Sequence, residues 1–262
     1  VENTPMSEFL KSDGYKIKYT KPIMKGWEPW RIAAKDLVDI PIKINTNLLQ
    51  HCKRAYIKDI IGSICACDLA DLFVLDDFTT VNGAPGVRSI DKIKRNTSAG
   101  FPWRKSKKFF LKLVPPIHGM QDPVEVSPEI LDRSNDIIQT YMKGIRAHPV
   151  FTAHLKDEAV TFSKAERKKT RVFTGAPFDW SLVVRKFYLS FVRVLQNNRL
   201  AFEAAVGTTA QSREWDGLYH YVTQQSPDHI VAGDFSAFDK RMPPVFILAA
   251  FEIIIEVCAL SG

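Results

Sequence analysis

Four segments of the chain repeat apolar residues at steps of three and four, which is the period of one helical face. They cover residues 45–76, 127–147, 181–195 and 244–260. Ser127 and Pro128 predict where the second helix begins, because serine caps helix N-termini and proline suits the first helical turn. Asp179 or Ser181 is expected to cap the third helix. The pattern therefore predicts a mostly helical chain.

Three other segments lack that period. The first 45 residues mix aromatic residues, prolines and lysines, which indicates an irregular extended arm. Residues 154–177 are rich in Lys, Arg and Thr and predict an extended basic hairpin. Residues 229–232, His-Ile-Val-Ala, predict a short buried strand that runs directly into Asp234. Helices combined with a few strands make α+β the expected fold class.

Composition places the chain among ordinary globular proteins. Of its 262 residues, 45% are hydrophobic and 25% are charged, which excludes a disordered chain, a collagen-like repeat and a coiled coil. No apolar run approaches the roughly 20 residues that a membrane-spanning helix needs. The net charge is +7 at neutral pH.

Two segments hold the excess of positive charge. Residues 88–112 contain nine Lys or Arg against one Asp, and residues 151–199 contain ten against four acidic residues. The remaining residues carry a net charge of −7. Two basic segments on an otherwise acidic chain indicate a track for a polyanion, since Lys and Arg release counterions when they meet phosphates. On charge alone, two solvated basic faces are an equal alternative.

The sharpest chemical feature is the pair Asp234 and Asp239 in the segment Gly-Asp-Phe-Ser-Ala-Phe-Asp. A strand that ends in a carboxylate would hold Asp234 at a sheet edge, where Mg²⁺ can share it with substrate phosphates. Asp239 follows five residues later and can face the same cleft. An isolated pair with this spacing is more often a strand end that caps the next helix, so the pair alone does not establish catalysis.

The predicted hairpin carries cations suited to phosphate oxygens. They include Lys156, Lys164, Lys169 and Arg171. Alternating cations on an extended arm suit a triphosphate, because Lys offers a point charge and Arg a planar fork. Viewed singly, an exposed basic loop without function is the more common explanation.

A short loop lies inside the first basic segment. It contains Thr97, Ser98 and Gly100, and small residues let another backbone approach closely. Their N–H and O–H groups can bind phosphates. An ordinary surface turn remains the commoner reading of such a loop by itself.

Taken together and in this order, these segments closely resemble the RNA-dependent RNA polymerases of picorna-like viruses. Thr-Ser-Ala-Gly-Phe-Pro at 97–102 is similar to that family's loop beside the template channel. Lys-Asp-Glu at 156–158, followed by Lys-Thr-Arg at 169–171, is similar to its nucleotide arm. Asp-Phe-Ser-Ala-Phe-Asp at 234–239 is similar to its first palm motif. The phrase Val-Asn-Gly-Ala-Pro-Gly-Val at 81–87 looks most like the insect iflavirus and dicistrovirus branches.

The resemblance implies roles for the carboxylates and the loop. Asp234 corresponds to the carboxylate that binds both catalytic Mg²⁺ (or Mn²⁺) ions. Asp239 corresponds to the carboxylate that senses the ribose 2′-hydroxyl of the incoming substrate. Thr97, Ser98 and Gly100 correspond to RNA-binding residues of the template channel.

The resemblance also implies roles for the cations of the arm. Arg171 and Lys156 correspond to catalytic basic residues over the incoming triphosphate. Lys164 and Lys169 correspond to weaker substrate-binding members of the same set. In-line attack on a phosphate depends mainly on positioning, metal charge and such basic clamps.

The architecture implied by the resemblance is a right-hand polymerase, α+β, with fingers in residues 1–180. Residues 181–262 would hold fingers and palm helices and the first palm strand. The implied function is viral RNA-directed RNA polymerase activity, a template-directed nucleotidyl transfer that replicates the genome. Implied partners are the RNA template and primer or product, nucleoside triphosphates and other viral replication proteins. The implied location is the host cytoplasm, at membrane-associated replication complexes.

The sequence departs from the family pattern in one respect. A Ser-Gly…Thr…Asn segment and a Gly-Asp-Asp hairpin, which follow in the family, do not occur before Gly262. The expectation is therefore an amino-terminal portion, truncated before the remaining palm motifs and the thumb. We expect this portion to be inactive alone, because one carboxylate cannot hold two cations about 4 Å apart.

Two alternatives from the residues remain open at this point. One is a non-catalytic basic RNA-binding module that uses no metal. The other is a reverse-transcriptase-like palm polymerase, which the Asp234 and Asp239 pair would also fit. A Gly-Asp-Asp flanked by apolar residues beyond Gly262 would favour the RNA polymerase over both.

Overall fold

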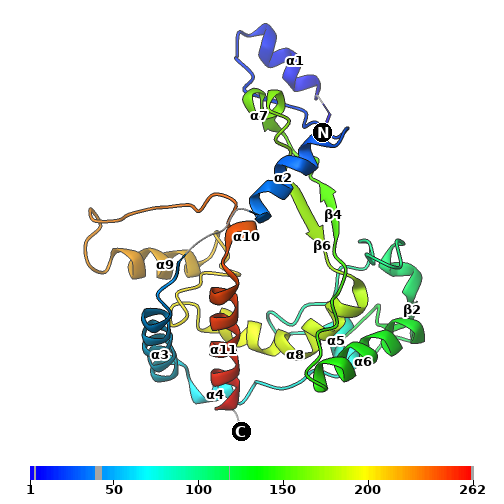
Figure 1. The fold of residues 1–262 in the computed structure, drawn as a ribbon, viewed down its shortest axis with the longest axis vertical. Helices are drawn as coiled ribbons and strands as arrows, with labels where there is room; N and C mark the ends of the chain where they lie inside the picture. Colours follow the sequence, from blue (N-terminus) through cyan, green and yellow to red (C-terminus); the bar gives the residue numbers. More distant parts are fainter. Residues whose placement is uncertain (3, 39–42, 118, 261–262) are drawn as a thin grey trace.

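The structure is a computed structural model that describes residues 1–2, 4–38, 43–117 and 119–260 (Figure 1). Helices form most of its regular structure. They are α1 (Pro5–Ser12), α2 (Glu28–Val38), α3 (Thr46–Ser63), α4 (Ala66–Leu69), α5 (Asp77–Asn82), the 3₁₀ helix η1 (Lys107–Phe110), α6 (Pro128–Met142), α7 (Phe162–Glu166), α8 (Phe178–Asn197), α9 (Arg213–Thr223), α10 (Phe238–Arg241) and α11 (Pro244–Ala259). The strands are β1 (Tyr19–Thr20), β2 (Leu111–Leu113), β3 (Val124–Val126), β4 (Thr152–Leu155), β5 (Val160–Thr161) and β6 (Val172–Gly175).

The described strands form three separate two-stranded antiparallel sheets, which pair β1 with β5, β2 with β3, and β4 with β6. In the third sheet, Thr152 lies opposite Gly175 and Leu155 lies opposite Val172. This sheet confirms the predicted basic hairpin. The mixture of helices and short strands confirms the α+β fold class.

Two hydrophobic cores are both built on α8. Phe178 and Leu182, at the start of α8, pack with Ala99 and residues from the β2–β3 hairpin and α6. Phe191 and Val194, near its end, pack in a second core with residues from α3 and α11. One long helix therefore joins the two halves of the body.

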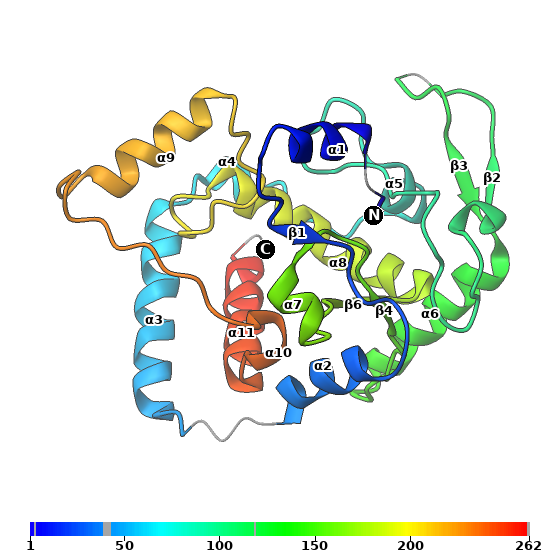
Figure 2. The same ribbon diagram turned by 90° about the horizontal axis from the view of Figure 1, so that it is seen from above.

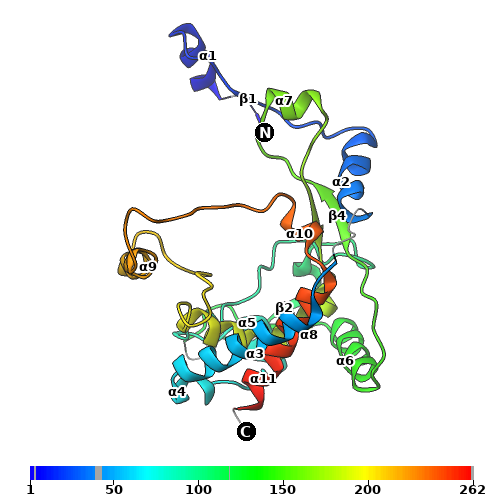
Figure 3. The ribbon, with the colours of Figure 1, turned by 60° about the vertical axis from the view of Figure 1, so that its left-hand side comes forward.

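The β4–β6 sheet rises from this body as an arm (Figures 1 and 3). At the far end of the arm lie α7, α1 and the β1–β5 pair, with α2 beside the strands (Figures 1 and 2). On the opposite flank, α9 stands apart from the arm, and a long connection leads from it to α10. The arm and this connection approach each other at α2, which contacts both β6 and α10.

Local signals correctly placed the starts of two of the four predicted helices. Ser127 precedes α6 and Pro243 precedes α11, as expected. The first predicted helix is shorter than expected, because α3 ends at Ser63 and only the short α4 follows. The helix α6 ends at Met142, not near residue 147.

The predicted cap of α8 is wrong. The residue that precedes the helix is Pro177, and Asp179 lies inside the first turn with 1% of its surface exposed. Its carboxylate accepts from Arg133 at 2.5 Å and from the Trp180 N–H at 2.7 Å. Asp179 therefore ties α6 to α8 instead of capping the helix.

The predicted irregular N-terminal arm is also wrong. It contains α1 and α2, which start near Pro5 and Pro29, and the strand β1. Each helix is short, so its apolar period covers too few turns to stand out against the mixed composition. Proline in the first turn was the available local signal.

The predicted strand at 229–232 does not form. These residues have no regular structure, and Val231 is 97% exposed. A β-strand needs a neighbour for its backbone hydrogen bonds, and none of the six strands lies beside it in the described part of the chain. Local propensity alone cannot supply that partner.

The predicted division at residue 180 falls in the first turn of α8 and stays a prediction. Among the described residues, no helix has the length and apolar character needed to span a membrane.

We predict that the chain self-associates through α11. Ile247, Leu248 and Ile255 are between 46% and 65% exposed on this helix, and exposed apolar patches drive association. Replacing Leu248 and Ile255 together by lysine should shift the chain toward monomer in light scattering. Replacing Val206, an exposed valine outside α11, by lysine is the matched control and should change nothing. A monomeric parent chain at high concentration would contradict the prediction.

Candidate functional site

The loop that carries Thr97 and Ser98 is held in place by its own side chains. The Thr97 hydroxyl accepts from the Lys107 ammonium at 2.8 Å and donates to the Lys94 carbonyl at 3.1 Å. The Ser98 hydroxyl accepts from the N–H of Gly100 at 3.1 Å. Both hydroxyl residues are exposed, so they remain accessible to a ligand.

Gly100 docks this loop onto the base of the arm. Its φ is +72°, and an added Cβ would lie 3.0 Å from both the Ala176 carbonyl oxygen and the Pro177 Cα. The neighbouring Ala99 is fully buried, and its carbonyl accepts from the N–H of Phe178 at 2.9 Å. Residues about 77 positions apart in the sequence therefore meet where β6 ends and α8 begins.

The cations of the arm gather around one carboxylate. The Lys156 N–H donates to the Arg171 carbonyl at 2.8 Å, just beyond the paired ends of β4 and β6. The Lys156 ammonium lies 2.9 Å from Glu158. Its hydrogen bond, followed by the charges of Lys156, Arg171 and Lys164, holds the pKa of Glu158 below its usual range. Lys156 thus pairs with Glu158, and Arg171 and Lys164 lie near enough for their charges to act on the same carboxylate.

The remaining predicted cation, Lys169, lies next to this cluster. Its N–H donates to the Lys164 carbonyl at 2.9 Å, which closes the turn after α7. The Asp157 carboxylate lies apart from this cluster, 2.7 Å from the nitrogen of Val1.

Sequence reasoning missed a contribution from the N-terminal segment to the arm. The pairing of β1 with β5 places Lys18 and Lys21 beside it, and both are exposed. The Thr170 hydroxyl, one residue before Arg171, donates to the Ile23 carbonyl at 2.7 Å. The alternation Lys-Ile-Lys-Tyr at 16–19 was the period-two signal that could have revealed this strand.

The two predicted carboxylates lie in α10, which contacts α2, and in the irregular segment just before it. Asp234 is exposed in the irregular segment that follows α9. Asp239 is exposed in α10, which begins after Ala237 with a φ of +53°. In the part of the chain that the structure describes, no hydrogen bond or ion pair connects either carboxylate to the arm. α2 contacts both β6 of the arm and α10, but among the described residues the carboxylates and the arm cations are not joined.

The described residues do not form a complete metal centre. They contain no group of three or more His, Cys, Asp or Glu side chains placed to hold an ion. Mg²⁺ takes one or two protein carboxylates and fills its other positions with water and phosphate oxygens. Asp234 can therefore supply one ligand, and it does not make a site by itself.

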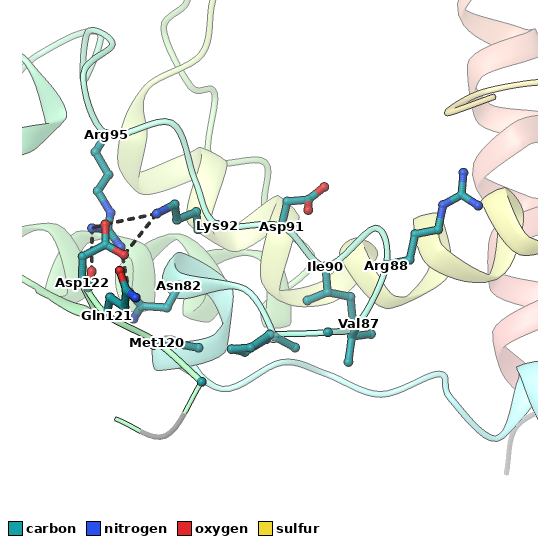
Figure 4. A pocket seen from close by; sticks show the side chains of 14 residues that line it. Asn82, Val87, Arg88, Ile90, Asp91, Lys92, Arg95, Met120, Gln121 and Asp122 are labelled. Atoms are coloured by element: carbon teal, nitrogen blue, oxygen red, sulfur yellow. Dashed lines mark hydrogen bonds and ion pairs between the residues drawn. The ribbon is translucent and has the colours of Figure 1, made fainter. Parts of the chain in front are cut away.

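A pocket of about 530 Å³ lies beside the segment that leads into the loop (Figure 4). On one side of it, Lys92 and Arg95 contact the Asp122 carboxylate at 3.1 and 2.9 Å. The Lys92 hydrogen bond and the Arg95 charge lower the pKa of Asp122. The buried Asn82 side chain accepts from the Val124 N–H at 2.9 Å and donates to its carbonyl at 2.8 Å. These contacts hold residues 92–95, the segment that leads into the loop, in place.

Comparison with known proteins gives consistent results. The family model described as viral RNA-dependent RNA polymerase matches residues 70–261. The replicase polyprotein of acute bee paralysis virus is 31% identical over 153 residues, covering 58% of this chain and 8% of the polyprotein. The genome polyprotein of deformed wing virus is 30% identical over 182 residues, covering 66% of this chain and 6% of the polyprotein.

A solved structure described as a Sicinivirus 3Dpol RNA-dependent RNA polymerase is similar in fold, with a TM-score of 0.73. The match covers 94% of this chain and 49% of that one at 18% identity, so it bears on the fold alone. The chain thus spans about half of the solved polymerase and less than a tenth of these polyproteins.

We predict that Gly100→Ala destabilises the chain by about 2 kcal/mol or more. The substitution forces a side chain into the left-handed region and against the backbone at Ala176 and Pro177. Gly144→Ala is the matched control, since Gly144 has a φ of +71° but open space around its Cβ position. Urea unfolding should show the larger loss for Gly100. Equal losses would mean that the close approach contributes nothing.

Proposed function

Because the chain belongs to the viral RNA-dependent RNA polymerase family, we propose that it forms the fingers and the start of the palm of an enzyme that copies RNA from an RNA template. Membership of this family excludes the reverse-transcriptase alternative. The RNA-binding module without catalysis is the outcome that the experiments below would reveal.

One observation carries the proposal. The template loop and the nucleotide arm, far apart in the sequence, are joined through Gly100 at the start of α8. A cluster of Lys156, Lys164 and Arg171 stands on the same arm. A loop for the template strand and cations for the triphosphate are the two parts that templated nucleotidyl transfer has to hold at a set distance.

In this proposal each predicted residue has its own task. Arg171 and Lys156 bind and orient the triphosphate, and Glu158 keeps their side chains close together until the nucleotide arrives. Thr97 and Ser98 offer exposed hydroxyls to the template backbone. These residues do their work by positioning and charge and need no proton transfer of their own.

Asp234 is proposed as one metal ligand, and Asp239 as the residue that recognises the ribose 2′-hydroxyl. Polymerases of this family generally use divalent cations, and Mg²⁺ or Mn²⁺ would neutralise charge that develops on the phosphates. The other ligands would come from parts of the protein that this chain does not span.

The proposed substrates are RNA and nucleoside triphosphates, and other viral replication proteins are proposed partners. The proposed location is the host cytoplasm, at membrane-associated replication complexes. This location rests on the resemblance of the sequence to picorna-like viral polymerases.

We predict that Asp234→Asn in the full-length polymerase slows primer extension by more than about 100-fold, because it removes a metal-binding charge. RNA binding, measured by fluorescence anisotropy, should stay near the parent value. Asp228→Asn changes an exposed carboxylate in the same irregular segment and is the matched control. Extension by Asp234→Asn at the parent rate would remove Asp234 from the site.

We predict that Arg171→Ala raises the KM for nucleotide about tenfold or more, since hydrogen bonds to charged groups contribute about 1.5–3 kcal/mol. Arg171→Lys should lose most of the same affinity, because an ammonium cannot replace the planar fork. Arg167→Ala removes a cation from the same arm outside the Glu158 cluster and serves as control.

The RNA-binding module predicts the opposite pattern. There, Arg171→Lys would be nearly silent, and Arg171→Ala would lower the salt slope of RNA binding by about one unit. Nucleotide KM and the salt slope, measured on the same variants, decide between the two functions.

A further inference from the structure

The helix α9 sits on the flank of the molecule with no buried residue (Figures 1 and 3). Polar contacts hold it at both ends: Glu214 in its first turn, and Tyr221, whose hydroxyl donates to Glu203 at 3.0 Å, in its last. Residues 224–237, which follow α9, form no helix or strand and include Asp234. The anchoring of α9 therefore sets where this segment begins.

Glu214 gathers donors from three separate segments. Arg88 donates to it with both terminal nitrogens, one of them at 3.0 Å. Arg199, just after α8, lies 3.0 Å away, and the Thr209 N–H donates at 3.0 Å. The side chains of Glu214 and Arg199 are only 21% and 13% exposed. The Arg88 side chain is 55% exposed, so the Arg199 pair is the shielded part of the network, where ion pairs are stronger than on an open surface.

The segment around Arg88 is fastened to the same place by further contacts. Arg88 also donates to the Gly207 carbonyl at 3.2 Å, and the Ser89 hydroxyl donates to the Gln196 side chain at 2.5 Å. Gly207 has a φ of +75°, a backbone conformation that favours glycine, and it lies close to the end of the Gln196 side chain. Arg88 stands at the opposite end of its segment from Arg95 and points away from it (Figure 4).

This segment runs directly into the template loop. Four residues after Ser89, the Ile93 N–H donates to the Val81 carbonyl at 2.9 Å, and Ile93 packs with Ala99 in the first core. Contacts of Arg88 and Ser89 therefore fix the approach to the template loop from one side. The contacts of Asp122 fix it from the other.

The carboxylate of Glu214 stays ionised well below neutral pH, so its ion pairs persist there. The hydrogen bond from Arg88, then the Thr209 N–H and Arg199, hold the pKa of Glu214 well below its usual range. It is ionised at neutral pH and stays so when the solution becomes moderately acidic. Its contribution to stability is present above the unfolded-state pKa and is lost only as pH falls through the lowered folded-state value.

We propose that Glu214 is a positioning residue that couples the approach to the template loop with the segment that carries Asp234. It does so by holding Arg88, Arg199 and the first turn of α9 in one network. The inference rests on the proposed function for its catalytic consequence. Its structural half, the coupling of the two segments, can be tested on this chain alone.

Hydrogen exchange on the chain tests the coupling directly. Glu214→Gln keeps the size of the side chain but removes its charge, and should speed amide exchange about tenfold or more in residues 205–237 and 84–95. Exchange in β4 and β6 should not change. Glu203→Gln is the matched control, because it changes the side chain that accepts from Tyr221 at the other end of α9. It should affect amide exchange in α9 but not in residues 84–95.

Two results would overturn the coupling. One is unchanged exchange in residues 84–95 for Glu214→Gln. The other is an equal increase throughout the chain, including the arm, which would mean a general loss of stability.

Kinetics of the full-length polymerase test the consequence. If Glu214 positions the Asp234 segment, Glu214→Gln should lower kcat about tenfold while the KM for nucleotide changes little. Arg88→Ala should do the same, and the double variant Arg88→Ala with Glu214→Gln should be no slower than either single variant. Losses that multiply would show that the two residues act independently and would refute the proposal. An inactive parent polymerase would instead count against the proposed function, leaving the exchange result to decide the coupling.

Discussion

The packing of α8 into both hydrophobic cores is the constraint on which the other elements depend. Phe178 and Leu182 enter the first core and Phe191 and Val194 enter the second, from a single 20-residue helix. A helix of this length is a rigid rod of about 30 Å. The cores cannot move relative to each other without unpacking one end of it, so the elements attached to either end keep their spacing.

The functional parts differ in how firmly they are attached to this rod. The arm runs directly into α8 through Pro177. The loop with Thr97 is hydrogen-bonded to its first turn through Ala99 and lies against Ala176 and Pro177 through Gly100. The segment with Asp234 lies between two attachments: α9, which the network of Glu214 holds near the other end of α8, and α10 with α11, which packs in the second core. The loop with Thr97 and the β4–β6 arm are thus fixed directly on α8, whereas the segment with Asp234 is irregular between its two attachments.

Two carboxylates, Glu158 and Glu214, each lie among basic side chains. On the arm, Glu158 sits among cations that would otherwise repel one another, and the low pKa of its carboxyl reflects that position. Near α9, Glu214 does the same for Arg88 and Arg199. In each case one carboxylate offsets the mutual repulsion of basic side chains from different segments.

Much of the fold could be predicted where the signal is local. Ser127 and Pro128 marked the start of α6, the prolines before residue 245 marked α11, and the basic hairpin appeared as β4 and β6. The short N-terminal helices were missed because two or three turns give too few apolar repeats. The cap of α8 was misassigned because Asp179 is buried and pairs with Arg133 of α6, a partner that no sequence pattern reveals.

By itself, the sequence determined the chemistry of this protein: which residues can bind phosphate or metal, in what order they occur, and which family they match. Only the tertiary structure decided which of them meet. It brought Gly100 to Ala176 and Pro177, and it placed Arg88 on Glu214, 126 residues away. It also left residues 229–232 unpaired despite their strand-like composition. The physical reason is that composition and period act over a few residues, whereas strand pairing and ion-pair networks need partners that only long-range packing can deliver.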